Sequence, residues 1–232
     1  MKSRIIALVP AAGTGTRFGD ALPKQYLDID GHPLIFYTLK AFTKVSRIGH
    51  ITVVLSPDDN HWHKYGAEWA LLGDKLSTAM VGGNTRGQTV ANGLNEIATR
   101  LNLDANDWMM VHDAARPCIQ PELIEQFIDE LESDRIGGLL ALPLADTIKR
   151  ADGSLRVEAT VSRENLWRAQ TPQMFRVGLL KDALARCPLA TDEAQAIEAL
   201  GHQPKLIIGD SANLKVTYAQ DMKLARMLIR DE

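Results

Sequence analysis

Residues 10–24 combine small side chains with two cations in a spacing that suits phosphate chemistry. Apolar residues 5–9 have the composition of a strand, and the loop that follows is rich in alanine, glycine and threonine. Glycine leaves backbone N–H groups open to a polyphosphate and tolerates positive φ. Arg17 and Lys24 then follow, seven residues apart. Such a segment could hold a triphosphate and neutralise the charge of phosphoryl or nucleotidyl transfer. The alternative is an ordinary strand-to-helix turn with incidental basic residues.

The spacing in this loop excludes two familiar nucleotide-binding motifs. The P-loop pattern requires a second glycine five residues after the first, but Phe18 lies five residues after Gly13 and Asp20 five after Gly15. The dinucleotide-binding fingerprint requires a third glycine where Phe18 stands. Phosphate binding would therefore need a different loop geometry.

Two further strand-like runs end in polar or small residues. Residues 108–111 lead into His112 and Asp113, and residues 78–81 lead into Gly-Gly-Asn at 82–84. Ligands of open α/β sheets bind outside the carboxyl ends of the strands, so we expect both segments to share one crevice with the glycine loop. Asp113 could hold Mg²⁺ against a triphosphate, or cap the next turn as the ion-pair partner of Arg116.

Several polar residues allow two interpretations. The segment 82–89 could contact a base edge, or form a tight turn and a helix cap. Lys215 and Arg163 could each point to solvent or into the crevice. The acidic pair at 192–193 could bind a metal, but Thr191 before it favours a capped helix with Thr191 as N-cap. We interpret the His-Trp-His run at 61–63 as surface.

Strand-like runs alternate with helical patterns over the first 140 residues, which predicts a mostly parallel sheet covered by helices. We expect strands at 5–9, 51–55, 78–81, 108–111, 136–142, 206–208 and 214–216. We expect helices opening at Pro33 and Pro121, helices near 90–101, 177–185 and 192–200, and a last helix with a capping box of Thr217 and Gln220.

The polar segment 146–161 has the pattern of a β-hairpin, with Asp152-Gly153 at its turn. Its strands are too polar to anchor it by core burial, and an isolated hairpin is marginally stable. We therefore expect a β-arm at about 144–165 that projects and packs on a second copy of the chain. The alternative is a hairpin lying on its own domain.

The composition suits one soluble domain spanning residues 1–232, with 45% hydrophobic and 24% charged residues. A net charge of −3 gives no basic field for nucleic acid or an anionic membrane. The short apolar run at the N-terminus continues into the glycine loop, so we expect a core strand rather than a signal peptide, and a cytoplasmic location. Cys118 and Cys187 lack metal-binding spacing and are expected to be thiols, one disulfide being the alternative.

Several short motifs, in their order and spacing, resemble the 2-C-methyl-D-erythritol 4-phosphate cytidylyltransferase family along the whole chain. They are VPAAGTGTRFG, PKQY, VGGNTRGQTV, VHDAARP, DTIKR, TVSRENLW, TPQ, TDEA and NLKVT. The resemblance implies an α/β enzyme with a Rossmann-like, mostly parallel sheet flanked by helices, and a protruding β-arm that swaps across a homodimer. It implies that CTP and methylerythritol phosphate give 4-diphosphocytidyl-2-C-methyl-D-erythritol and pyrophosphate, with Mg²⁺, in non-mevalonate isoprenoid biosynthesis.

The resemblance also assigns roles to residues of this chain. Arg17 and Lys24 match the catalytic pair. Asp113, Thr147 and Arg163 match acceptor-binding residues, the last two from the partner's arm, and Asp113 also matches the metal ligand. The positions expected to contact the nucleotide are Pro10, Ala11, Ala12, Gly13, Gly15, Gly83, Asn84, Thr89, Ala114 and Lys215.

Three departures and two competing functions remain. Asn84 stands where relatives often have Asp, Thr89 stands where they often have Ser, and Ser162 replaces an acid beside Arg163. A sister cytidylyltransferase for another sugar-alcohol phosphate, such as ribitol 5-phosphate, would differ in the arm, where Thr147 and Arg163 favour methylerythritol phosphate. A non-catalytic nucleotide-binding regulator would lack members of the Arg17, Lys24 and Asp113 set, all of which are present.

Overall fold

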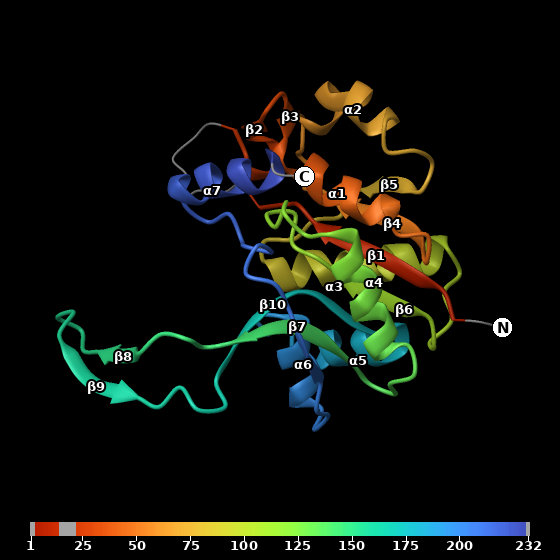
Figure 1. The fold of residues 1–232 in the computed structure, drawn as a ribbon. Helices are drawn as coiled ribbons and strands as arrows, with labels where there is room; N and C mark the ends of the chain where they lie inside the picture. The colour runs from red at the N-terminus through yellow and green to blue at the C-terminus, as the bar shows by residue number, and fades with distance from the viewer. Residues whose placement is uncertain (1–2, 14–21, 231–232) are drawn as a thin grey trace.

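The computed structural model describes residues 3–13 and 22–230, and its centre is a seven-stranded sheet (Figure 1). The strand order is β11-β7-β10-β6-β1-β4-β5. The strands are β1 (Ile5–Pro10), β4 (Ile48–Val54), β5 (Leu76–Ala79), β6 (Trp108–Val111), β7 (Gly137–Pro143), β10 (Trp167–Arg176) and β11 (Lys205–Ile208).

All strands of this sheet except β10 run in one direction. β1 pairs in parallel with β4 and β6, β4 with β5, and β11 with β7. β10 lies between β6 and β7 and is antiparallel to both. The predicted mostly parallel sheet is therefore confirmed, and the carboxyl ends of β1, β4, β5 and β6 lie at one edge.

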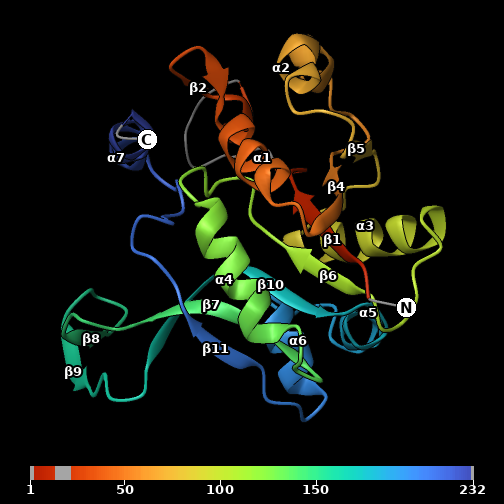
Figure 2. The same ribbon diagram turned by 45° about the vertical axis from the view of Figure 1, so that its right-hand side comes forward.

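Helices cover both faces of the sheet, as Figures 1 and 2 show. Alternate residues of β1 point to opposite faces, so Ala7 packs with one core cluster and Leu8 with the other. The first cluster includes α1 (Leu34–Lys44) and α4 (Pro121–Leu131). The second includes α3 (Arg86–Arg100), α5 (Val177–Arg186) and α6 (Glu193–Ala199). Both faces of the central strands are therefore buried, as in other parallel sheets.

The remaining elements surround this sandwich. The short strands β2 (Asp28–Ile29) and β3 (His32–Pro33) pair with each other, and α7 (Ala219–Arg230) packs near them in a third apolar cluster. Two 3₁₀ helices, η2 (Lys24–Tyr26) and η3 (Trp62–Tyr65), and the short helix α2 (Gly66–Ala70) also lie outside the central sheet. None of the described helices is long and apolar enough to cross a membrane.

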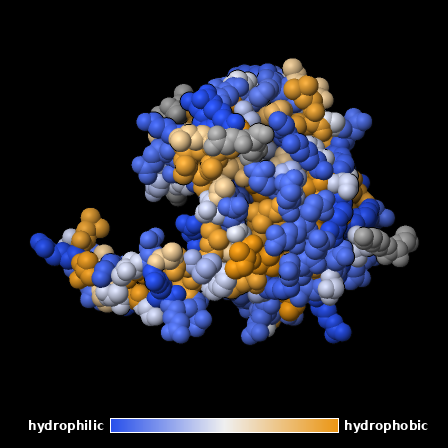
Figure 3. Space-filling view, in the orientation of Figure 1, coloured by the Kyte–Doolittle hydropathy of each residue, from blue (hydrophilic) through white to orange (hydrophobic). Residues whose placement is uncertain are grey.

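The hairpin predicted in the polar segment forms a separate two-stranded sheet. β8 (Ile148–Ala151) pairs antiparallel with β9 (Val157–Val161), and the pair extends away from the body of the molecule (Figure 1). We call residues 144–165 the arm. Leu155 is 90% exposed and Val157 65% exposed, and the surface of the extension is a mixture of hydrophilic and hydrophobic residues (Figure 3). The arm therefore gains little from burial within its own chain.

Four local predictions were wrong or incomplete. Strand β10 was not predicted, because Gln170 and Gln173 make its sequence polar and Pro172 lacks an N–H for strand pairing; the register shift between Ala169 and Gln173 accommodates the proline. Residues 214–216 form a loop and not the expected strand. Helix α6 is capped by Asp192, not Thr191. Before α7, the Asp221 carboxylate accepts the N–H groups of residues 217 and 218, so the expected Thr217–Gln220 capping box is absent. Cys118 and Cys187 are both thiols, as predicted.

A buried aspartate fixes the amino end of the sheet, opposite the edge described above. The Asp107 carboxylate accepts hydrogen bonds from the backbone and guanidinium of Arg4 at 2.6–2.9 Å and from the Asp104 N–H at 2.9 Å. Burial would raise the pKa of Asp107, but these hydrogen bonds hold it below its ordinary value. The carboxylate thereby joins the start of β1 to the start of β6.

We expect Asp107→Asn to lower the free energy of unfolding by about 1–3 kcal/mol, because the new amide N–H₂ faces donors of Arg4. Asp182→Asn is the control, since its ion pair with Arg186 is exposed and such pairs contribute about 0–1 kcal/mol. Denaturant unfolding of both variants measures the difference. Equal midpoints for the two variants would contradict this assignment.

Candidate active site

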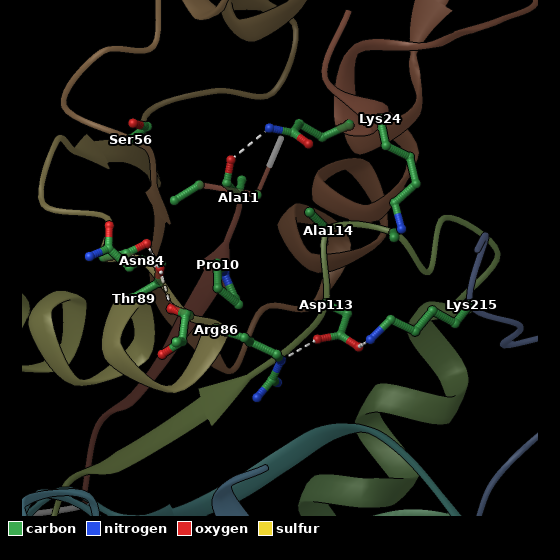
Figure 4. A pocket seen from close by; sticks show the side chains of 16 residues that line it. Pro10, Ala11, Lys24, Ser56, Asn84, Arg86, Thr89, Asp113, Ala114 and Lys215 are labelled. Carbon is green, nitrogen blue, oxygen red and sulfur yellow. Dashed lines mark hydrogen bonds and ion pairs between the residues drawn. The ribbon is translucent and has the colours of Figure 1, made fainter. Parts of the chain in front are cut away.

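A cavity of about 470 Å³ opens at the carboxyl ends of β1, β5 and β6 (Figure 4). The glycine loop, the segment after β5 and the segment after β6 all contribute to it, so the predicted shared crevice is confirmed. Its lining residues are Pro10, Ala11, Ala12, Gly13, Lys24, Gln25, Ser56, Gly83, Asn84, Thr85, Arg86, Thr89, Asp113, Ala114, Ala115 and Lys215.

Hydrogen bonds hold the small-residue loop and Lys24 against the sheet. The Ala11 N–H donates to the Val54 carbonyl at 2.8 Å, and the Gln25 side chain donates to the Ala11 carbonyl at 2.7 Å. The Lys24 ammonium donates to the Val216 carbonyl at 2.7 Å. Lys24 is therefore placed at the crevice by its neighbour Gln25 and by the loop after β11.

The other side of η2 is anchored by a buried tyrosine. The Tyr26 hydroxyl donates to the Asp59 carboxylate at 2.7 Å, and the ring stacks on Tyr65 at 5.7 Å between centroids. Asp59 also accepts the N–H groups of His61 and Trp62 at the start of η3. Burial and the neighbouring Asp59 raise the pKa of Tyr26 well above its usual value, so its hydroxyl remains a donor.

The segment after β5 forms both a tight turn and a helix cap. A Cβ on Gly82 would lie 2.7 Å from the Leu55 carbonyl oxygen, so only glycine allows this approach. The Thr89 hydroxyl accepts the Gly83 N–H at 3.0 Å and donates to the Thr85 carbonyl at 2.9 Å. Thr85 is the N-cap of α3. The turn and cap interpretation is therefore correct, and Gly83, Thr85 and Thr89 also line the cavity.

Asp113 lies at the centre of a charged cluster. Its carboxylate accepts from the Arg86 Nε at 2.8 Å and pairs with the Lys215 ammonium at 2.8 Å (Figure 4). The Arg116 Nε lies 3.7 Å away. Arg86 continues to Glu193, with Nη1 and Nη2 at 2.7 and 3.1 Å from the two carboxylate oxygens. Lys215 therefore points into the crevice, which answers the question that the sequence left open.

These cations determine the charge state of Asp113. Burial would raise the pKa of the carboxyl, but Arg86, Lys215 and Arg116 hold it well below its usual range. For Arg86, burial alone would lower the pKa, but the neighbouring carboxylates of Glu193 and Asp113 raise it above its ordinary value. Asp113 is thus an anion and Arg86 a cation throughout the physiological pH range.

His112 is buried beside this cluster and does not line the cavity. Its Nδ1 lies 3.1 Å from the Thr171 hydroxyl, and its Nε2 lies 3.3 Å from the Arg116 carbonyl. The Thr171 hydroxyl also accepts the Asp113 N–H at 3.0 Å. Burial lowers the pKa of His112 to about 3, so the ring is neutral and serves the structure of the turn around Asp113.

Two groups of predicted residues are not among the described residues that line the cavity. Arg17 and Gly15 fall outside the described residues. Thr147 and Arg163 are exposed at the two ends of the arm, and neither is among the described residues that line the cavity.

Sequence reasoning missed Arg86 and Glu193 as a pair, because their contact spans 107 residues of chain. The two acidic residues at 192–193 could have indicated a buried ion pair, but the sequence pattern favoured a helix cap. The described residues contain no group of three or more His, Cys, Asp or Glu side chains that could hold a metal. A cation at Asp113 would therefore take most of its ligands from a bound molecule or water.

Solved structures share the whole fold. A crystal structure of a 4-diphosphocytidyl-2C-methyl-D-erythritol synthase matches with a TM-score of 0.86 and 38% identity, covering 98% of this chain and 100% of the other. A 2-C-methyl-D-erythritol 4-phosphate cytidylyltransferase from Thermus thermophilus matches with a TM-score of 0.77 and 29% identity, covering 99% and 100%. The mostly parallel sheet flanked by helices is thus that of an α/β nucleotidyltransferase.

Comparison of the amino-acid sequence with known families identifies one family within this class of enzymes. The family model of 2-C-methyl-D-erythritol 4-phosphate cytidylyltransferase matches residues 5–231. Proteins of that name from Dechloromonas aromatica (strain RCB) and Nitrosomonas eutropha (strain DSM 101675 / C91 / Nm57) are 54% and 46% identical, over 98% of this chain and 98% and 97% of theirs. The chain therefore belongs to the 2-C-methyl-D-erythritol 4-phosphate cytidylyltransferase family.

The neutral state of His112 makes stability depend on pH. Below about pH 6.5 the unfolded chain protonates this histidine and the folded chain does not, until about pH 3. The free energy of unfolding should therefore fall by about 1.4 kcal/mol per pH unit and proton on acidification. Relative to the parent, His112→Gln should lose about 2 kcal/mol less between pH 7 and pH 5. Denaturant unfolding at both values tests this, with the exposed His202→Gln as control. Parallel pH profiles for the parent and His112→Gln would refute it.

Proposed function

We propose that this chain transfers the cytidylyl group of CTP to 2-C-methyl-D-erythritol 4-phosphate. The products would be 4-diphosphocytidyl-2-C-methyl-D-erythritol and pyrophosphate, in isoprenoid biosynthesis. Family membership along residues 5–231 supports the reaction. The observation that supports it from the site is the crevice itself, where a small-residue loop faces Lys24, Lys215 and the paired Arg86 and Asp113. The family also supports a cytoplasmic location.

The proposed reaction is an in-line displacement. A phosphate oxygen of the acceptor attacks the α-phosphorus of CTP, and the bond from this phosphorus to the oxygen bridging to the β-phosphate breaks. Pyrophosphate leaves with the electron pair. Because the nucleophile is already an anion, positioning and charge neutralisation are what the protein must provide. We infer that Lys24 stabilises the charge that builds up on the α-phosphate and that Arg17 holds the leaving pyrophosphate.

The nucleotide would lie against the first two segments of the crevice. Loop residues Pro10, Ala11, Ala12 and Gly13, with Gly15, would face the triphosphate, while Gly83, Asn84 and Thr89 would lie near the base and ribose. The hydroxyl of Thr89 already bonds to the turn, so we infer that it acts there by holding the Gly83 backbone. Ala114 and Lys215 would complete the site from the third segment.

Asp113 fits a role as a magnesium ligand. Its oxygens accept from Arg86 and Lys215 but keep further lone pairs, and Mg²⁺ commonly uses one or two carboxylates with phosphate oxygens. A bound Mg²⁺ would neutralise phosphate charge. The same carboxylate is our candidate contact for the acceptor.

We further propose that the acceptor site is completed by the arm of a second copy. Thr147 and Arg163 lie at the ends of an exposed arm whose apolar residues are uncovered in its own chain. A homodimer in which each arm packs on the partner would bury the apolar residues of the arm and bring Arg163 to the partner's crevice.

The first test is pyrophosphate release with CTP and Mg²⁺, comparing methylerythritol phosphate with ribitol 5-phosphate. We expect release with the former. Lys24→Ala should lower kcat by roughly 10²–10³-fold, because a cation that stabilises the transition state is lost. The exposed Lys40→Ala is the matched control and should leave kcat unchanged. Release with ribitol 5-phosphate alone would show that ribitol 5-phosphate, not methylerythritol phosphate, is the acceptor. Near-normal turnover by Lys24→Ala would show that Lys24 does not stabilise the transition state.

Mixing two inactive variants tests the arm. In a hybrid of Lys24→Ala and Arg163→Ala chains, one site carries both changes and the other carries neither. Random reassociation should therefore restore roughly a quarter of parental activity. Each variant reassociated with itself is the control. A mixture no more active than its components would show that Arg163 does not act on the partner's crevice.

A further inference from the structure

Glu193 is a charged residue that neither lines the cavity nor contacts solvent. It is the first residue of α6 and is 0% exposed. The hydrogen bonds to its carboxylate among the described residues come from the fork of Arg86, at 2.7 and 3.1 Å. A buried carboxylate is costly unless it is paired, so Arg86 accounts for its burial. What Glu193 contributes to Arg86 is the remaining question.

The pair fixes the orientation of the Arg86 guanidinium. Both terminal nitrogens face Glu193, while Nε donates to Asp113 at 2.8 Å. A guanidinium is planar, so two anchored edges leave it one orientation. In that orientation Arg86 offers Asp113 one N–H instead of its bidentate fork. The rest of the Asp113 carboxylate remains available to Lys215 and to a bound molecule.

Glu193 also balances the charge near Asp113. Among the described residues, three cations surround this carboxylate, namely Arg86, Lys215 and Arg116, at 2.8, 2.8 and 3.7 Å. Without Glu193, the fork of Arg86 would be free to turn toward Asp113 or toward phosphates in the crevice.

The backbone that bears Glu193 is itself fixed to the sheet. The Gln173 side chain, on β10, accepts the Ala194 N–H at 2.8 Å and donates to the Asp192 carboxylate at 3.0 Å. Gln173 pairs with Val111, two residues before Asp113. The start of α6 and the end of β6 are therefore tied to the same strand, which makes Glu193 a rigid support.

We propose that Glu193 is a positioning residue, which acts through Arg86 to hold Asp113 available for the acceptor. The reaction in which it acts rests on the proposed function. The orientation of Arg86 does not, so it can be measured in the unliganded protein.

NMR of the arginine side chains tests the orientation. In the parent protein, Arg86 should show slow rotation about its Nε–Cζ bond, seen as separate Nη resonances; Arg86→Lys assigns the signals by their loss. Glu193→Gln keeps the shape and removes the charge. It should shift the Arg86 Nε–H signal and speed the rotation. Glu198→Gln, an exposed change in the same helix, should do neither.

Steady-state kinetics test the consequence. We expect Glu193→Gln to raise the KM for the acceptor at least roughly fivefold and to leave the KM for CTP within about twofold, with Glu198→Gln unchanged in both. A purely structural role would reduce the amount of folded enzyme and leave both KM values unchanged. Thermal unfolding of each variant measures the folded fraction.

Each result decides one point. An Arg86 signal that rotates freely in the parent, or is the same in parent and Glu193→Gln, overturns the proposal. So does an unchanged acceptor KM in an active Glu193→Gln enzyme. If Glu193→Gln does not fold, the rotation in the parent decides alone. A parent that releases no pyrophosphate with the acceptor refutes the proposed function, and the NMR result still decides whether Glu193 orients Arg86.

Discussion

The crevice depends on keeping one buried carboxylate ionised. Asp113 is 7% exposed, and an unpaired charge at that depth would be strongly disfavoured. The cations that stabilise it come from separate parts of the chain: Arg86 begins α3, Arg116 follows β6, and Lys215 follows β11. Arg116 lies three residues from Asp113 in the same turn, whereas Arg86 and Lys215 reach this carboxylate only when the sheet is assembled. The charge cluster is therefore both a product of the fold and a constraint on it.

A second group of contacts fixes the opposite wall. Gln25 bonds to the backbone of the small-residue loop, and Tyr26 bonds to Asp59 beyond β4. Lys24 lies directly before these two anchors. A flexible lysine side chain thus begins from a rigid backbone position, which limits the entropy lost when it binds a phosphate.

The sequence predicts those parts of the fold that follow from local pattern. Apolar runs predicted β1, β4 and β6. Because the glycine loop and Asp113 each follow one of these strands, the sequence also predicted that they lie at the same edge of the sheet. Local sequence pattern gave wrong predictions where polar side chains find their hydrogen-bond partners far away in the sequence. Gln173 makes β10 look unlike a strand, yet its amide binds the start of α6. Arg86 and Glu193 each look like ordinary helix-end residues, because their partner is 107 positions away. Leu214 and Val216 are apolar because they pack with α7, not because they form a strand.

The position of the arm in the sheet has an evolutionary consequence. β7 and β10 are antiparallel neighbours, and the arm is the chain that connects them. The arm is thus the tip of a long hairpin whose base lies within the sheet. Insertions, deletions or exchange at such a tip leave the register of the supporting strands intact. Under the proposed function, the segment that selects the acceptor can therefore change in length and sequence without altering the nucleotide-handling edge of the sheet.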